Sequence, residues 1–276
     1  MDIEKAMMEE KFTIEKWFEV SFQILKRNWI QWITISTITT VILSAIFYFL
    51  FQEISLMILK ISSQPEDYKQ ILLTQAHKTG LLALAALFVL NFIDLYMIHK
   101  TSQWYSGKML TVEETFLKVL SAMPVSIILT IIYTLMTTIS LFFCVIPVIF
   151  VIVYFLFIFQ ALMIEDKGFG SLGRSIELVK PNFGVLVVLP FVISLGLQFT
   201  NSLPFYLIQL IIENFIGQTI TPEMSSREVF EFLIKSPYIL FISAPWILFF
   251  SLQSNLKSIL YTVAFEQARQ INPTKE

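Results

Sequence analysis

Residues 125–164 read VSIILTIIYTLMTTISLFFCVIPVIFVIVYFLFIFQALMI, a run without a charged side chain. As one α-helix, this run would be roughly 60 Å long at about 1.5 Å per residue, about twice the ~30 Å thickness of the hydrocarbon core of a bilayer. It therefore predicts two membrane spans, at 125–143 and 147–164. Pro147 lies between them, and proline interrupts a helix because it lacks an N–H and clashes with the preceding turn. We place the bend of a tight hairpin there, with its apolar tip in the interface.

The composition agrees with a membrane protein. Apolar residues make up 56% of the chain and charged residues 14%, against about 25% charged residues in a soluble domain, and the mean hydropathy is +0.72. The net charge of -2 argues against nucleic acid as a partner. The single cysteine, Cys144, excludes an internal disulfide and a cysteine metal cluster, and we expect it to pack as a small hydrophobic residue.

Four further apolar runs have about the 20 residues that a span needs. They predict spans at 29–51, 80–98, 183–200 and 238–256. The run 183–216 is long for one span and short for two. We take residues 201–204 as the end of that span and predict that 205–216 forms a helix in the outer interface. The expected fold class is all-α: one polytopic membrane domain, 1–276, with six transmembrane helices paired as three hairpins.

The lysine and arginine residues predict the orientation, because short positively charged segments stay in the cytoplasm. With the N-terminus inside, only five of these residues fall in outer loops: Lys60, Lys69, Lys78, Arg227 and Lys235. We therefore expect both termini in the cytoplasm and a location in the cell membrane. The N-terminus lacks the basic segment and cleavage site of a signal peptide, so the first span is expected to remain as an anchor.

Amphipathic segments precede the odd-numbered spans, at 13–28, 111–123 and 171–181. Each begins with a hydroxyl residue that suits a helix N-cap, and Glu114 completes a capping box with Thr111. Because these segments are too short to span, we expect three helices in the cytoplasmic interface, each followed by a hairpin. The alternative is the ordinary amphipathic start of a helix that enters a membrane.

Two motifs, ALMIEDKG at 161–168 and SIELVKPN at 175–182, resemble the membrane domain that is fused to some bacterial glycerophosphoryl diester phosphodiesterases and also occurs alone, with unknown role. The likeness is specific from 143 to 182. It implies a proline-centred hairpin, an acidic exit from the membrane and an interfacial helix with a Ser-x-x-Leu-x-Lys-x-Asn pattern. The residues that it singles out are Glu165, Asp166, Lys180 and Asn182, with Arg174 beside them. The chain has no phosphodiesterase barrel and only two histidines, so hydrolase activity is not implied.

Asp94 is the only acid inside a predicted span, and Asn91 precedes it by one helical turn. An intramembrane carboxylate suggests proton or ion coupling. The alternative is a structural role, in which Asp94 pairs with a basic residue or a helix N-terminus near the cytoplasmic headgroups. Arg174 and Lys180 suit anionic headgroups, although the orientation rule alone also places basic residues there.

Other polar residues have simple structural interpretations. Lys257, near Ser254 and Ser258, fits a lysine that extends its amine to the interface better than it fits a Ser-Lys dyad. The hydroxyl stripes on the first and third spans, such as Ser126 and Thr130, favour close helix packing; the alternative is the lining of a lipid or solute path. His77 and His99 flank the second span on opposite sides and cannot share a metal.

These observations predict a non-enzymatic integral membrane protein that binds or handles lipid, or serves as an envelope scaffold. Its expected partners are membrane lipids, a membrane-protein partner is not identified, and no cofactor or metal is expected. The alternative is a small secondary transporter in which Asp94 is the coupling carboxylate. An intramembrane protease is disfavoured, since the chain has no His-Glu-x-x-His motif.

Overall fold

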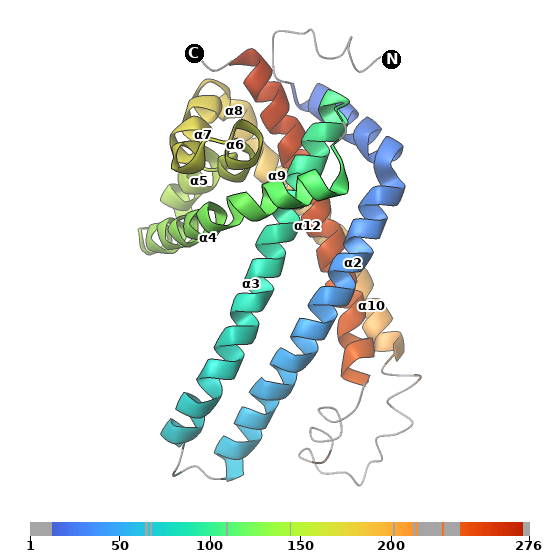
Figure 1. Cartoon of the computed structure of the whole chain (residues 1–276), viewed down its shortest axis with the longest axis vertical. Helices are drawn as coiled ribbons and strands as arrows, with labels where there is room; N and C mark the ends of the chain where they lie inside the picture. The colour runs from blue at the N-terminus through green and yellow to red at the C-terminus, as the bar shows by residue number, and fades with distance from the viewer. Residues whose placement is uncertain are drawn as a thin grey trace. The chain divides into compact units, whose positions relative to one another are not determined.

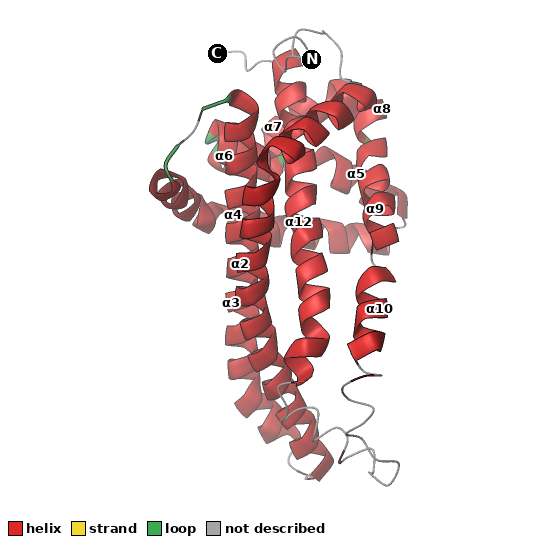
Figure 2. Ribbon diagram, turned by 90° about the vertical axis from the view of Figure 1, so that its right-hand side faces the viewer, coloured by secondary structure: helices red, strands yellow, loops and turns green. Residues whose placement is uncertain are grey.

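A computed structural model describes residues 13–63, 66, 68–108, 110–143, 145–200, 202–211, 214, 228 and 238–272. Every regular element among these residues is a helix, and none is a strand (Figures 1 and 2). The α-helices are α2 (Ile14–Ser63), α3 (Tyr68–Ser106), α4 (Val112–Phe142), α5 (Val145–Tyr154), α6 (Ile158–Glu165), α7 (Ser171–Val179), α8 (Phe183–Leu186), α9 (Val188–Thr200), α10 (Ser202–Ile211) and α12 (Tyr238–Ile271). Two short 3-10 helices are η2 (Gly168–Gly170) and η3 (Lys180–Asn182).

Five helical stretches of the described residues are long and apolar enough to cross a membrane. They are Ile14–Ile61, Tyr68–Ser106, Val112–Phe142, Ile146–Ile164 and Val188–Leu210. The predicted span at 238–256 lies in α12, which is not among the five. The regular structure of the described residues is thus all helical and includes several helices that fit a bilayer, as the composition predicts.

The chain divides into two compact units. Unit 1 comprises residues 1–33, 91–197 and 253–276, and unit 2 comprises 34–90 and 198–252. The long helices α2, α3 and α12 each contribute residues to both units. Unit 1 holds the residues around Asp94 and both motifs of the family resemblance.

Helix α2 has a kink at the end of the first predicted interfacial segment. Asn28, at the end of 13–28, has non-helical backbone angles (φ -118°, ψ 20°) inside α2. Its amide Nδ2 donates to the Ile24 carbonyl at 2.9 Å, so the side chain satisfies a carbonyl at the break. The helix then continues to Ser63, past the predicted end of the span at residue 51.

The second interfacial segment is not a separate helix. The predicted helix 111–123 and the predicted span 125–143 form one helix, α4, which runs through Pro124. Helices in membranes tolerate a proline because neighbouring groups compensate for the lost hydrogen bond. The predicted capping box is confirmed, because Thr111 Oγ1 accepts from the Glu114 N–H at 3.2 Å and Glu114 Oε2 accepts from the Thr111 N–H at 2.8 Å.

The break between the two helices of this region falls earlier than the predicted bend. Helix α4 ends at Phe142 and α5 begins at Val145, so Pro147 lies in the first turn of α5 instead of at the bend. Proline is tolerated there because the first N–H groups of a helix have no partner within it. Cys144, and with it the prediction of how it packs, lies outside the described residues.

The predicted span 147–164 is broken into two helices. Helix α5 ends at Tyr154 and α6 begins at Ile158, and residues 155–157 form a turn between them. The third interfacial segment, 171–181, is helical as α7 and η3. The predicted span 183–200 contains α8 and α9, and α10 covers most of the predicted outer helix; within 212–216, only residue 214 is described.

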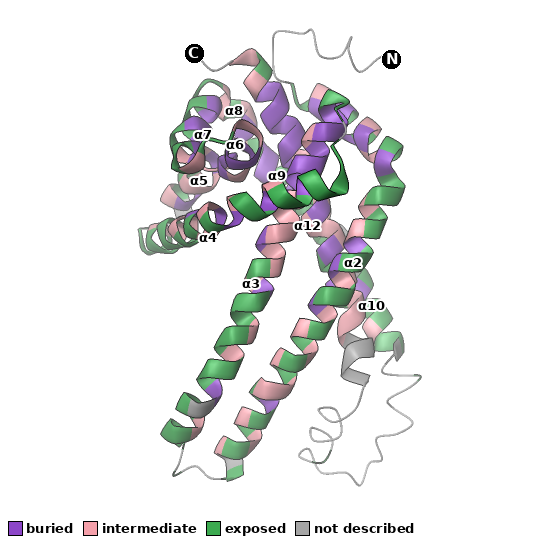
Figure 3. Cartoon of the chain, viewed as in Figure 1, coloured by how far each residue is buried: buried purple, intermediate pink, exposed green. Residues whose placement is uncertain are grey.

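The core of unit 1 draws on both ends of the chain. Its buried apolar side chains include Trp17, Val20 and Ile24 of α2, Leu95 and Ile98 of α3, Val119 and Met123 of α4, Ile158 and Leu162 of α6, Leu178 of α7, and Ile259, Val263 and Phe265 of α12. The Trp17 indole Nε1 donates to the Leu260 carbonyl at 2.8 Å. Residues 261–268, which the sequence reading left outside the spans, are all buried (Figure 3).

Unit 2 exposes large apolar side chains along its helices. Ile38, Val41, Leu73, Leu81 and Leu84 are all exposed on α2 and α3 (Figure 3). A soluble protein rarely exposes contiguous apolar surface of this kind, whereas the hydrocarbon of a bilayer is a suitable solvent for it. The burial pattern therefore agrees with the membrane assignment.

Candidate functional site

Unit 1 contains a polar cavity of about 200 Å³, which we call the Asp94 cavity. Four parts of unit 1 form its walls: α3, α4, the broken pair α5 and α6, and α12. The lining residues are Asp94, Ile98, Tyr133, Ile152, Phe155, Leu156, Phe159, Gln160, Ser254, Lys257, Ser258 and Tyr261. A carboxylate, an amine, two serine hydroxyls and an amide therefore meet within a largely apolar chain.

The Asp94 carboxylate is held by two hydroxyl groups. Ser254 and Ser258, one turn apart on α12, each donate to Asp94 Oδ1 at 3.1 Å. The other oxygen, Oδ2, has no hydrogen-bond donor among the described residues. A structural role for Asp94 was predicted to involve a basic residue or a helix N-terminus; the observed partners are hydroxyls.

Lys257 lines the same cavity but forms no ion pair with Asp94 within 4.0 Å. Its Nζ lies 5.6 Å from the centre of the Tyr261 ring, a distance that suits a cation–π contact. The residues Ser254, Lys257 and Ser258, which looked like a local group in the sequence, thus share a site with Asp94. The serines donate to the acid, so the arrangement is not that of a Ser-Lys dyad.

Gln160 adds a second unused acceptor. Gln160 is 3% exposed, and its Oε1 has no hydrogen-bond partner among the described residues. A buried polar atom without a partner costs about 1 to 3 kcal/mol. Such an atom in the wall of a polar cavity indicates a place for a ligand or water donor.

Asn91 has different hydrogen-bond partners from Asp94. Its Oδ1 accepts hydrogen bonds from Ser126 Oγ at 3.1 Å and Thr130 Oγ1 at 2.9 Å. The predicted hydroxyl stripe on the third span therefore joins α4 to α3, as close helix packing requires. Asn91 is absent from the cavity wall.

The cavity wall includes a helix break that another helix supports. Phe155 and Leu156 line the cavity within the turn between α5 and α6. Behind them, Ser175 of α7 accepts from the Phe157 N–H at 3.0 Å and donates to the Tyr154 carbonyl at 2.8 Å. One fully buried hydroxyl therefore satisfies a donor and an acceptor at the break, where an intact helix would pair both internally.

Helix α7 is itself held by a buried ion pair. The Arg174 guanidinium donates to both oxygens of Glu165, at 2.9 and 3.2 Å, and the two side chains are only 6% and 7% exposed. Arg174 also donates to the Asn272 carbonyl at 3.1 Å. These partners engage the guanidinium, so this geometry favours a structural role for Arg174 over headgroup binding.

The other residues of the family resemblance lie outside the cavity. Asp166 ends α6 in a left-handed conformation (φ 52°) and pairs with Lys118 at 3.2 Å on the surface. Lys180 is exposed in η3, and the Asn182 amide donates to the Leu178 carbonyl at 3.4 Å. Of this set, only Glu165 and Arg174 are brought together.

Glu266 was missed in the sequence because it lies beyond the last predicted span. It is 1% exposed and accepts from Ser102 Oγ at 2.6 Å, and its other oxygen pairs with Arg269 at 2.6 Å. Burial raises the pKa of this carboxyl above its ordinary value, while the Ser102 hydrogen bond and the Arg269 charge act in the opposite direction. The largely apolar stretch ILYTVAF at 259–265 was the signal of a buried helix here.

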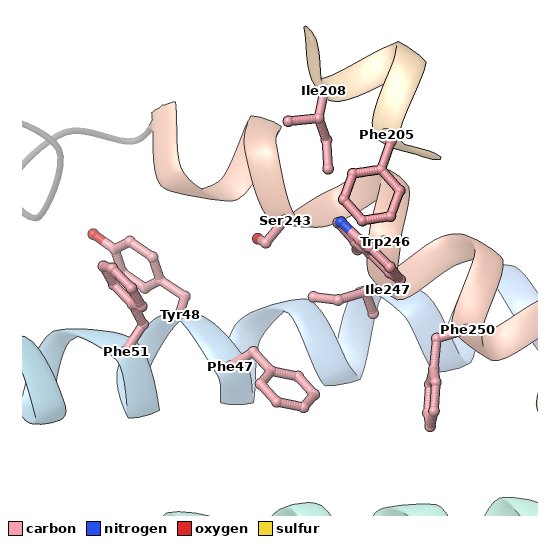
Figure 4. A pocket seen from close by; sticks show the side chains of 9 residues that line it. All are labelled: Phe47, Tyr48, Phe51, Phe205, Ile208, Ser243, Trp246, Ile247 and Phe250. Atoms are coloured by element: carbon pink, nitrogen blue, oxygen red, sulfur yellow. The ribbon is translucent and has the colours of Figure 1, made fainter. Parts of the chain in front are cut away.

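Unit 2 has an apolar cavity of about 570 Å³ with aromatic walls (Figure 4). The lining side chains are Phe47, Tyr48, Phe51, Phe205, Ile208, Ser243, Trp246, Ile247 and Phe250. Phe205 and Trp246 meet edge to face, with ring centres 4.9 Å apart. A cavity with this lining suits a hydrocarbon chain.

Within the described residues, no group of three or more His, Cys, Asp or Glu side chains is placed to hold a metal ion. Comparison with protein-family models, curated proteins and solved structures finds no match. Function must therefore be argued from the cavities themselves.

Proposed function

We propose that this chain is a non-enzymatic integral membrane protein that binds lipid. The observation that carries the proposal is the Asp94 cavity, in which an acid, an amine and hydroxyl groups face one another among apolar helices. An ionisable group inside a membrane span, as we propose for Asp94, is costly and is by default a functional candidate. The aromatic cavity of unit 2 supports the same function, because its lining suits an acyl chain.

The proposal includes six spans and three hairpins in the cell membrane, with both termini in the cytoplasm. The five apolar stretches supply five of these spans, and the apolar first half of α12 supplies the sixth. The resemblance to the membrane domain of glycerophosphoryl diester phosphodiesterases belongs to the proposal too, on the motifs at 161–168 and 175–182.

The test is to identify lipid that co-purifies with the chain. Protein purified in several detergents is analysed by mass spectrometry, with Asp94→Asn as the test variant and Glu19→Gln as the control. Glu19 is an exposed carboxylate of unit 1 that lies outside the cavity. We expect lipid with the wild type and the control and less with Asp94→Asn. Lipid-free protein from every detergent would refute lipid binding.

A second candidate is a small secondary transporter with Asp94 as the coupling carboxylate. The observation that favours it is the break between α5 and α6 beside the Asp94 cavity, because transporters often bind their substrates at discontinuous helices. In proteoliposomes, a pH-sensitive dye would record proton flux on addition of candidate solutes. Flux that is unchanged in Asp94→Asn ends the transporter hypothesis.

A further inference from the structure

The Asp94 cavity contains one acidic and one basic side chain, Asp94 and Lys257, and the two form no direct ion pair. Asp94 is bonded to hydroxyls, and Lys257 lies against the Tyr261 ring. Lys257 is exposed, and its charge acts on Asp94 only at a distance, without a direct ion pair. A ligand with a single charge would satisfy one of these residues and leave the other. A ligand with one positive and one negative group satisfies both.

The unused acceptors specify the positive group. Asp94 Oδ2 and Gln160 Oε1 lack donors among the described residues, and the two residues line the cavity. A primary ammonium has three N–H donors and can serve both atoms. A quaternary ammonium has none, so it would leave both acceptors without a hydrogen bond.

Lys257 indicates the chemistry of the negatively charged group of the ligand. A lysine amine is a compact point charge that commonly binds phosphate, and no acid among the described residues pairs with this one. The cavity of about 200 Å³ is smaller than the roughly 300 to 1,000 Å³ of sites for drug-sized ligands. It therefore suits a small polar group and not a whole lipid.

We propose that the Asp94 cavity binds a zwitterionic amine–phosphate group, with a primary ammonium at Asp94 and Gln160 and a phosphate at Lys257. This inference rests on the proposed lipid binding and names its headgroup class. The same chemistry is present in the headgroup of phosphatidylethanolamine and in free phosphoethanolamine, so the experiment separates these two sources.

The experiment measures binding to the full chain in detergent by native mass spectrometry. The probes are phosphatidylethanolamine, phosphatidylcholine and phosphatidylglycerol with matched acyl chains, and free phosphoethanolamine as a competitor. We expect phosphatidylethanolamine to bind at least about tenfold more tightly than the other two lipids, since phosphatidylcholine has no N–H donor and phosphatidylglycerol offers neutral hydroxyl donors in place of an ammonium. Competition by free phosphoethanolamine would identify a soluble ligand; its absence would identify the lipid headgroup.

The variants separate the two charges. Asp94→Asn should reduce the affinity for phosphatidylethanolamine to that for phosphatidylglycerol, whereas Lys257→Gln should weaken all three lipids by a similar factor. Gln160→Leu keeps both charges and removes one acceptor, so it tests the ammonium site if Asp94→Asn does not fold. The matched controls are Glu19→Gln and Lys26→Gln, two exposed residues of unit 1.

Two outcomes would overturn the inference in distinguishable ways. If phosphatidylglycerol binds as tightly as phosphatidylethanolamine, and Asp94→Asn and Gln160→Leu change neither affinity, lipid binding stands but the ammonium site is wrong. If none of the lipids binds the wild type, the proposed function fails together with its headgroup class.

Discussion

The ion pair between Glu165 and Arg174 is buried, so its two members depend on each other. Arg174→Met would leave the Glu165 carboxylate without its counter-charge. Breaking a buried pair in this way costs about 3 to 5 kcal/mol. We expect a loss of that order in the apparent free energy of unfolding in detergent, measured by denaturant titration with tryptophan fluorescence.

The double variant Arg174→Met/Glu165→Met should regain most of this loss, because no unpaired charge remains. Lys118→Met serves as the control. It breaks the pair with Asp166, whose side chain is 71% exposed, and exposed pairs contribute about 1 kcal/mol or less. Equal losses in Arg174→Met and Lys118→Met would contradict this account.

Glu266 should make stability depend on pH in a definite direction. Burial raises its folded-state pKa, so the unfolded chain releases this proton at a lower pH than the folded chain does. The contribution of Glu266 is fully present below its unfolded pKa of about 4.3 and is lost as the pH rises through the raised value. We therefore expect the apparent melting temperature of the wild type to fall relative to Glu266→Gln over that range.

The measurement compares melting temperatures of the two proteins from about pH 4 upwards, in one detergent. Glu113→Gln is the control, since it removes an exposed carboxylate at the start of α4. Parallel curves for the wild type and Glu266→Gln would show that Glu266 titrates alike in the folded and unfolded chains.

At the scale of residues, the sequence indicated part of the site. Asp94 was recognisable because a lone acid in an apolar run is conspicuous. Its partners were not, because Ser254 and Ser258 are 160 and 164 positions away and only the fold brings them near. Gln160 was hidden for another reason: one amide at the end of an apolar run resembles an ordinary interfacial residue.

The break between α5 and α6 depends on an element that is separate in the sequence. Ser175→Ala would leave the Phe157 N–H and the Tyr154 carbonyl without their partner, at a cost of about 1 to 3 kcal/mol in the apparent free energy of unfolding. Phe155 and Leu156 line the Asp94 cavity, so we also expect weaker binding of any cavity ligand.

Ser121→Ala is the matched control for this change. Ser121 is exposed on α4, and its hydroxyl donates only to the Lys118 carbonyl of the same helix, so its loss should change stability by less than about 0.5 kcal/mol. Denaturant titration gives the stability and native mass spectrometry the ligand affinity. A Ser175→Ala protein that matches Ser121→Ala in both would mean that the break is stable without α7.

At the scale of elements, helical character was predictable and several boundaries were not. Apolar runs of suitable length identified the regions of α2, α3 and α4. Two prolines do not mark the predicted boundaries, because Pro124 lies inside α4 and Pro147 lies in the first turn of α5. Proline removes the N–H donor from its backbone position, whereas the neighbouring helices determine whether the chain bends there.

The proposed topology can be tested on the whole molecule. In a Cys144→Ala background, single cysteines are introduced at Ser63, Lys108, Lys167 and Glu228, all exposed, and at the C-terminus. With six spans, a membrane-impermeant maleimide should label intact cells only at 63 and 228. The other three positions should react only after permeabilisation. Labelling of the C-terminus in intact cells would show that α12 does not cross and that the count of six is wrong.

The number of spans is the property of the whole molecule that sequence reasoning reaches least securely. The first part of helix α12 is apolar, and its second part contains Glu266, Gln267 and Arg269. The mean hydropathy of the whole helix is therefore low. Burial of that second part in unit 1 could not be anticipated, because its partners include Trp17 near the other end of the chain.

The hydrogen bond between Trp17 and the Leu260 carbonyl spans 243 positions, and this separation has a consequence for biosynthesis. At about 5 to 20 residues per second, the ribosome needs roughly 10 to 50 s to reach the second residue after the first has been made. During this interval, Trp17, which is buried together with Val20 and Ile24 in the core of unit 1, lacks its hydrogen-bond partner on α12. The membrane surface can shelter this apolar stripe, since α2 begins as an amphipathic helix. A chain that stops before α12 would keep the stripe uncovered, and quality-control proteases would have a means to recognise unfinished copies.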